Sequence, residues 1–245
     1  MKTVLITGCS SGFGLATAQY FLERDWKVIA TMRNPNGKLF EASEHLRVLP
    51  LDVTDPDSIQ QVVEAAGPIN VLVNNAGIGL LGALEGISMQ AIRGIFETNT
   101  FGTMAMTQAV LPQFRQRKSG VVVNVTSSVT MKSLPLLSVY TASKAAVNAF
   151  TESLALELEP FNVRMSLVLP GRAPTTDFGK NAQPRMQGSI PEAYSDLAQR
   201  VFTEWSQSTV VTEAQDVTEA IWRAANDPTS PMRIAAGADA IALER

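Results

Sequence analysis

The chain has 245 residues, of which 45% are hydrophobic and 18% are charged, and its formal net charge is −3 at pH 7. This length and apolar content are enough for one large domain with a substantial core. The mildly acidic charge argues against a nucleic-acid partner, because the basic run Arg115-Gln116-Arg117-Lys118 is more typical of a solvated helix end.

The sequence contains a single cysteine, Cys9, and a single histidine, His45. One cysteine cannot form an intramolecular disulfide, and the pair cannot assemble a His/Cys metal cluster, so we expect no metal. No apolar stretch reaches the ~18 residues of a membrane span, and the apolar run at the N-terminus is too short for a signal peptide. We therefore expect one cytoplasmic domain over residues 1–245, without a membrane partner.

The first unit of the chain is a short apolar run, Val4-Leu5-Ile6, followed by a glycine-rich stretch and a helical pattern. This order predicts a strand, a turn and a helix. Glycines let backbone N–H groups approach a pyrophosphate at the helix N-terminus, where the helix dipole also favours an anion. The spacing Gly8, Gly12, Gly14 differs from the usual G-x-G-x-x-G fingerprint, so a glycine-rich loop without a ligand is the alternative.

A second strand is predicted at residues 27–32, and Arg33 follows it directly. In dinucleotide-binding folds an acidic residue near this point binds the ribose of NAD, whereas an arginine pairs with the 2′-phosphate of NADP. Arg33 therefore indicates NADP, with a solvated loop residue as the alternative.

Five more apolar segments predict strands, at residues 47–51, 71–73, 120–125, 163–169 and 233–236. Helical patterns separate the strands, and one helix should begin at the cap Asp55-Pro56 and end near Ala66. The alternation predicts an α/β fold: a Rossmann-like, doubly wound, mainly parallel seven-stranded sheet with helices on both faces.

Two helical regions carry candidate polar residues. The pattern from Ser88 to about Phe114 contains Thr98-Asn99-Thr100 and Gly102, which lower helix propensity and predict a local kink. The kink could turn Asn99 inward, although a surface asparagine is the alternative.

Tyr140 and Lys144 stand four residues apart, so a helix places them on one face. A nearby ammonium favours phenolate and lowers the pKa of a tyrosine from ~10, which makes the phenol usable in acid/base chemistry. The same spacing is common on plain helix faces.

The strand before this helix ends at Thr126-Ser127-Ser128, which places a hydroxyl at the edge of the sheet where such folds bind ligands.

Residues 172 to about 206 are expected to be the least regular part, because prolines and glycines break any long element. Such a segment is often a substrate-binding loop, and its apolar side chains could line a pocket. These side chains are Phe178, Met186, Tyr194, Phe202 and Trp205. A short helix packed on the core explains residues 194–205 equally well. The run Thr212-Glu213-Ala214-Gln215 predicts a capping box and a helix to about Ala225.

Five features in fixed order resemble the classical short-chain dehydrogenase/reductase family over essentially the whole chain. They are Thr7 to Gly14, Asn74 to Gly77, Asn99, Ser127, and Tyr140 with Lys144. The resemblance implies an NADPH-dependent carbonyl reductase or ketoreductase, which transfers a hydride between NADP(H) and a ketone or aldehyde and its alcohol. It also implies a homodimer or homotetramer. The aromatic side chains of residues 172–206 indicate an apolar or aromatic substrate.

The resemblance implies a catalytic role for Asn99, Ser127, Tyr140 and Lys144. Tyr140 would donate a proton to the carbonyl oxygen, and Ser127 would hydrogen-bond that oxygen. Lys144 would lower the pKa of Tyr140 and bind the nicotinamide ribose, while Asn99 would hold a water that connects Lys144 to solvent. Ser127 is preferred to Ser128 because the family's serine precedes the tyrosine by thirteen residues.

The resemblance also implies the residues that contact the cofactor. They are Gly8, Ser10, Ser11, Gly12, Phe13 and Gly14 in the turn, Arg33 at the 2′-phosphate, Asp52 and Val53 at the adenine, Asn75, Ala76 and Gly77, Tyr140 and Lys144, and Pro170, Gly171 and Thr175 at the nicotinamide. The ending Ala236–Ala240 departs from the glycine-glycine ending of acyl-carrier-protein ketoreductases. It is closer to carbonyl reductases related to 17β-hydroxysteroid and retinol dehydrogenases. A non-catalytic NADP-sensing or scaffold protein of the same fold is the alternative.

Overall fold

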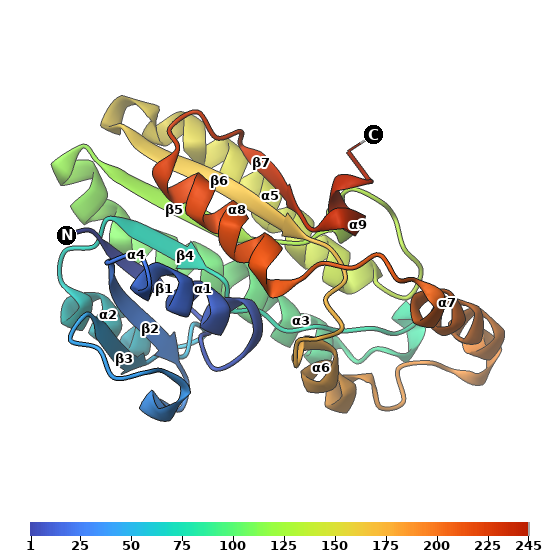
Figure 1. Ribbon diagram of the computed structural model, residues 1–245. Helices are drawn as coiled ribbons and strands as arrows, with labels where there is room; N and C mark the ends of the chain where they lie inside the picture. Colours follow the sequence, from blue (N-terminus) through green and yellow to red (C-terminus); the bar gives the residue numbers. More distant parts are fainter. Residues whose placement is uncertain (245) are drawn as a thin grey trace.

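The computed structural model describes residues 1–244, and one parallel sheet of seven strands forms its centre (Figure 1). The strands are β1 (Thr3–Ile6), β2 (Lys27–Met32), β3 (Leu46–Pro50), β4 (Val71–Asn74), β5 (Gly120–Val125), β6 (Val163–Pro170) and β7 (Arg233–Ala236). Their order across the sheet is β3-β2-β1-β4-β5-β6-β7, and each neighbouring pair is parallel. The predicted doubly wound α/β fold is confirmed. Arg245, the last residue of the predicted domain, lies outside the described residues.

The strand order reverses between β1 and β4, which are hydrogen-bonded neighbours although the chain passes through β2 and β3 between them. In doubly wound sheets, ligands bind beyond the carboxyl ends of the strands at such a reversal. The glycine-rich turn follows β1, and Asn75 follows β4. Both segments therefore begin at the expected binding edge.

Long helices cover the two faces of the sheet. One face packs against α1 (Gly12–Leu22) and α8 (Ala214–Asn226), and the other packs against α2 (Pro56–Ala66), α4 (Gly102–Arg117) and α5 (Ser138–Leu158). In β1, the buried side chains of Val4 and Ile6 face the first group, and that of Leu5 faces the second. This alternation is the two-residue period of a strand buried on both faces.

The remaining helical elements are shorter. They are α3 (Met89–Phe96), α6 (Phe178–Met186), α7 (Ser195–Gln207) and α9 (Ala238–Ile241), with single turns at Gly37–Leu39, Leu84–Gly86, Ser128–Thr130, Glu159–Phe161 and Glu192–Tyr194. The predicted kink is a π-helical segment, Glu97–Phe101, between α3 and α4. It turns Asn99 inward, where the side chain is buried. Within residues 1–244, no helix has the length and apolar character needed to cross a membrane.

Two expectations about the later part of the chain were wrong. Residues 172–206 are not irregular, since α6 and α7 fill most of them, and α6 contains Pro184. The alternative of a helix is confirmed by α7, but its buried residues Ala198 and Val201 belong to a satellite apolar cluster and not to the core of the sheet. The capping box of α8 uses Glu213 and Asp216, not Thr212. Figure 1 shows α6 and α7 beyond the carboxyl edge of the sheet.

Candidate active site

The turn after β1 approaches its neighbours closely at its glycines. Gly8 and Gly12 have φ values of 74° and 56°, which favour glycine. A Cβ atom on Gly8 would lie 2.9 Å from the Cα atom of Ala76, and one on Gly14 would overlap the carbonyl oxygen of Gly8. We call the turn Gly8–Gly14 the cradle; its backbone packs so closely that side chains at Gly8 and Gly14 would disrupt it.

This cradle ends at the N-terminus of α1. Ser11 precedes the helix, but its side chain makes no capping hydrogen bond, and the first turn contains no acidic residue. The positive end of the helix dipole is therefore left to an external anion, and the cradle fits the pyrophosphate of a dinucleotide. Ser10 is exposed, whereas Phe13 packs partly buried against the core.

The segment after β4 braces the cradle. The hydroxyl oxygen of Thr7 accepts hydrogen bonds from the backbone N–H groups of Asn75 (3.0 Å) and Ala76 (2.9 Å). The side-chain amide of Asn75 donates to the carbonyl oxygens of Thr7 (2.9 Å) and Gly8 (3.1 Å). Four hydrogen bonds thus join the ends of β1 and β4, and the structure brings these predicted site residues together.

Ser127, Tyr140 and Lys144 meet at the end of β5. The hydroxyl of Ser127 lies close enough to the phenol of Tyr140 to lower its pKa. The Nζ atom of Lys144 donates to the carbonyl oxygen of Val125, the last residue of β5, at 3.0 Å. All three side chains are buried. Of the two candidate serines, Ser127 is the one beside the phenol, while Ser128 begins a single helical turn.

Burial shifts the pKa values of this pair in opposite directions. It raises the pKa of Tyr140 to about 12, although the nearby hydroxyl of Ser127 lowers it, and it lowers the pKa of Lys144 to about 8. The net pKa of Tyr140 is raised because desolvation of the phenol dominates, and a lowering contribution from Lys144 stays a prediction. The phenol is therefore protonated at neutral pH and able to donate.

Asn99 fixes the backbone around the phenol and the ammonium. Its amide accepts from the backbone N–H of Ile78 (2.8 Å) and donates to the Ile78 carbonyl (2.9 Å) and to the hydroxyl of Ser143 (3.2 Å). That hydroxyl in turn donates to the carbonyl oxygen of Tyr140 at 2.7 Å. A Cβ atom on Gly77 would lie 3.3 Å from both the Asn99 Oδ1 and Lys144 Nζ atoms. Asn99 is therefore at the site, and the implied water stays a prediction.

Arg33 is exposed just after β2. Its charge acts on two other charged side chains, Asp52 and Arg185. Hydrogen bonds from Thr54 and, more weakly, the charge of Arg33 lower the pKa of Asp52. Burial and then the charge of Arg33 lower the pKa of Arg185 in α6. Val53 instead packs inward against α4, so its contact with an adenine ring stays a prediction.

The turn after β6 brings the next segment back to the cradle. Pro170 ends β6, and Gly171 donates its backbone N–H to the Thr212 hydroxyl at 2.9 Å. Thr175 is exposed, whereas a Cβ atom on Gly12 would lie 3.5 Å from the Cβ atom of Thr176. Thr176, the neighbour of the predicted Thr175, is therefore the threonine that lies close to the cradle.

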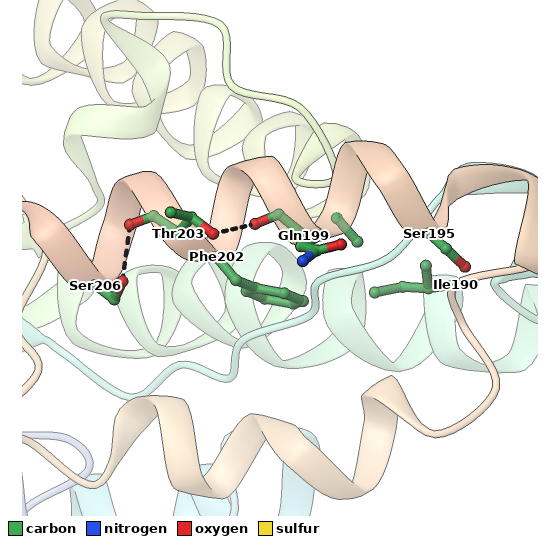
Figure 2. Close-up of a pocket in the computed structure, with 7 residues that line it drawn as sticks. Ile190, Ser195, Gln199, Phe202, Thr203 and Ser206 are labelled. Atoms are coloured by element: carbon green, nitrogen blue, oxygen red, sulfur yellow. Dashed lines mark hydrogen bonds between the residues drawn. The ribbon is translucent and has the colours of Figure 1, made fainter.

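We call residues 173–211, which carry α6 and α7, the lid. Phe178 of α6 lies on the ring of Tyr140, and a Cβ atom on Gly79 would lie 2.9 Å from the Cε1 atom of Phe178. Phe202 of α7 instead borders an open groove on the lid itself (Figure 2), and none of the four catalytic candidates lines that groove. Of the expected apolar side chains, Phe178 is the one that contacts Tyr140.

Comparisons with known proteins agree with this geometry. A family model described as short chain dehydrogenase matches residues 2–187. Human retinol dehydrogenase 8 is 37% identical over 254 residues, which cover 95% of this chain and 80% of that protein. A short-chain dehydrogenase structure from Streptomyces avermitilis has a TM-score of 0.82 and 31% identity, over 99% of this chain and 91% of the other. The closed form of a serine dehydrogenase complexed with NADP+ has a TM-score of 0.82 and 26% identity, over 95% and 93% of the two chains.

Proposed function

This chain belongs to the short-chain dehydrogenase family, and from that premise we propose that it is an NADP-dependent alcohol dehydrogenase or ketoreductase. Its substrate would be an apolar ketone or aldehyde, or the corresponding alcohol. One observation carries the proposal: Ser127 and Tyr140 lie buried together with Lys144 at the binding edge of the sheet.

The bound nicotinamide cofactor would supply or accept the hydride. The Ser127 hydroxyl would hold the carbonyl oxygen of the substrate, and the Tyr140 phenol would donate a proton to that oxygen. Proton loss would leave a buried phenolate, which is costly without a compensating charge. The Lys144 ammonium, one helical turn away, would provide that charge.

The choice of NADP over NAD rests on Arg33. Its guanidinium is exposed at the end of β2, where a 2′-phosphate would give it a bidentate anionic partner. The cradle Gly8–Gly14 would hold the pyrophosphate, and Asn75, Ala76 and Gly77 would pass beside the adenosine half. The serine dehydrogenase relative crystallised with NADP+ supports this choice.

The substrate class rests on Phe178 and on the human relative. An aromatic side chain over the proton donor gives a carbonyl compound an apolar surface to contact. The name of the human relative contains retinol, which is an apolar alcohol. We therefore propose that apolar bulk near the carbonyl favours binding.

A homodimer or homotetramer is proposed on the same family premise. The helices that carry Asn99 and Tyr140 would pair between subunits, and Phe101 and Leu156 on these elements expose 52% and 74% of their surface. Sedimentation at micromolar concentration tests this, since a monomer would contradict it.

Initial rates of NADPH oxidation, and separately of NADH oxidation, against ketones from small aliphatic to bulky aryl compounds test the function. We expect turnover with NADPH that rises with apolar bulk. Tyr140→Phe should lower kcat/KM by about 10²–10⁴, the usual contribution of a positioned proton donor. Tyr20→Phe is the matched control, because Tyr20 lies on α1 and its ring contacts Trp222 and Arg24. Tight NADPH binding without turnover would favour a sensing role.

A further inference from the structure

Asp239, in the C-terminal segment Ala236–Ala240, makes hydrogen bonds through both of its carboxylate oxygens. The Oδ2 atom of Asp239 accepts from the backbone N–H of Arg172 at 2.6 Å. Its Oδ1 atom lies 2.7 Å from the hydroxyl of Thr212. One carboxylate therefore joins two segments that flank the lid.

Thr212 completes this contact. Its hydroxyl accepts from the backbone N–H of Gly171 at 2.9 Å, and its own N–H donates to the carbonyl oxygen of Arg172 at 2.8 Å. We name Gly171, Arg172, Thr212 and Asp239 the neck, because the lid leaves and rejoins the domain there. The approach is close, since a Cβ atom on Gly171 would overlap the carboxylate of Asp239 and one on Gly237 would overlap the hydroxyl of Thr212.

The neck lies at the reacting end of the site. Val125 of β5 pairs in register with Val168 of β6, and the N–H of Thr126 donates to the carbonyl oxygen of Val168 at 2.8 Å. Two residues further along each strand, Ser127 follows β5 and Pro170 ends β6. Gly171 therefore leaves the sheet beside Ser127, whereas the glycine cradle lies across β4, after β1.

A hydride can reach a carbonyl held by Ser127 and Tyr140 only from a ring that lies next to these residues. On the proposed function, which this inference rests on, the nicotinamide must then lie beside the neck. We propose that Asp239 is a positioning residue that holds the turn Gly171–Arg172 in place for the nicotinamide half of the cofactor. The adenosine half depends on the cradle and Arg33, which the neck does not contact.

A neutral amide can replace the carboxylate without breaking the neck. In Asp239→Asn the side-chain oxygen can still accept from the N–H of Arg172, and the amide can donate to the hydroxyl of Thr212. The hydroxyl of Thr212 can then donate its hydrogen to the carbonyl oxygen of Ala236, which lies 2.9 Å from the hydroxyl oxygen. Asp239→Ala removes both interactions. A comparison of the two variants therefore tests whether the hydrogen bonds, and not the negative charge, hold the neck.

The experiment compares two ligands by titration: NADPH, followed by the fluorescence of its nicotinamide, and adenosine 2′,5′-bisphosphate, which has no nicotinamide. We expect Asp239→Ala to weaken NADPH binding about tenfold, as loss of two hydrogen bonds at a site can, and to leave the bisphosphate affinity unchanged. Asp239→Asn should restore NADPH binding to within about twofold of wild type. Glu244→Ala is the matched control, because Glu244 is an exposed carboxylate near the same end of the chain.

Thr212→Val and Thr212→Ser give a second pair, in which the serine keeps the hydroxyl and should keep NADPH binding. Unchanged NADPH binding in Asp239→Ala would overturn the inference. Equal weakening of both ligands would overturn it too, because the neck would then support the whole domain and not the nicotinamide half. Wild-type protein that binds neither ligand would remove the proposed function, and this inference with it.

Discussion

The rings of Tyr140 and Phe178 lie with their centroids 5.8 Å apart and their planes at 58°. Tyr140 belongs to α5 and the body of the domain, whereas Phe178 begins α6 in the lid. Tyr140 is 7% exposed, whereas Phe178 is 42% exposed. The lid therefore touches the proton donor through one apolar side chain that still has a free face for a substrate.

Phe178→Ala should raise KM for bulky aryl ketones about tenfold and change KM for small aliphatic ketones little, because only the larger substrates contact the ring. Steady-state kinetics over a ketone series measures this. Phe202→Ala is the control, since Phe202 is 41% exposed on the same lid but borders the groove of Figure 2. Equal effects of the two substitutions would contradict a specific role for Phe178.

The buried ammonium of Lys144 should make stability depend on pH. The folded chain releases this proton near its pKa of about 8, but the unfolded chain holds it up to 10.5. Between these values the unfolded state binds more protons, so the free energy of unfolding rises with pH. Relative to Lys144→Met, wild type should gain about 2.5 kcal/mol between pH 7 and pH 10.

Denaturant unfolding at several pH values measures this difference. Lys132→Met is the control, because Lys132 is exposed and its removal should leave the pH dependence unchanged. A constant difference between wild type and Lys144→Met across the window would show that burial does not depress the pKa of Lys144.

Arg33→Ala should weaken NADPH binding by about 10–100-fold and leave NADH binding nearly unchanged, because only NADPH carries the 2′-phosphate. Fluorescence titration with each cofactor measures the ratio. Arg47→Ala is the control, since Arg47 is exposed on the neighbouring strand β3. If both cofactors weaken equally, Arg33 does not select between them.

Two glycine-to-alanine substitutions should change the free energy of unfolding in opposite directions. In Gly14→Ala the new Cβ atom meets the Gly8 backbone, which cannot move without opening the turn, so we expect a loss of about 2 kcal/mol or more. In Gly94→Ala no atom lies within 4 Å of the new Cβ, and α3 should gain about 0.5–1 kcal/mol. Thermal and denaturant unfolding measure both, and two losses would contradict the glycine argument.

Local patterns predicted most of the sheet because its central strands are buried on both faces. The bounds of β2, β5 and β7 match the predicted ranges, and α2 begins at the expected Pro56. The lid was harder to predict, because Pro184 and Gly179 suggest breaks that the packing of α6 overrides. Thr212 resembles a helix cap, but its hydroxyl is used in a tertiary contact that no local pattern records.

The sequence predicted which residues form the candidate site better than it predicted their pKa values. Spacing alone placed Tyr140 and Lys144 on one helix face, and the structure brings Ser127 and Asn99 to them. The pKa of Tyr140 could not be predicted from the sequence, because its direction depends on how completely the fold removes water. The part played by Asp239 depends on a contact between segments 67 residues apart.

The neck fastens both ends of the lid at one point of the domain. A segment whose ends meet can change in length at a small entropic cost, because closure depends only on the logarithm of the number of residues. The sheet, the cradle and the pair of Ser127 and Tyr140 all lie outside it. A change of length within residues 173–211 would therefore leave the closure at the neck, and the catalytic residues outside it, in place.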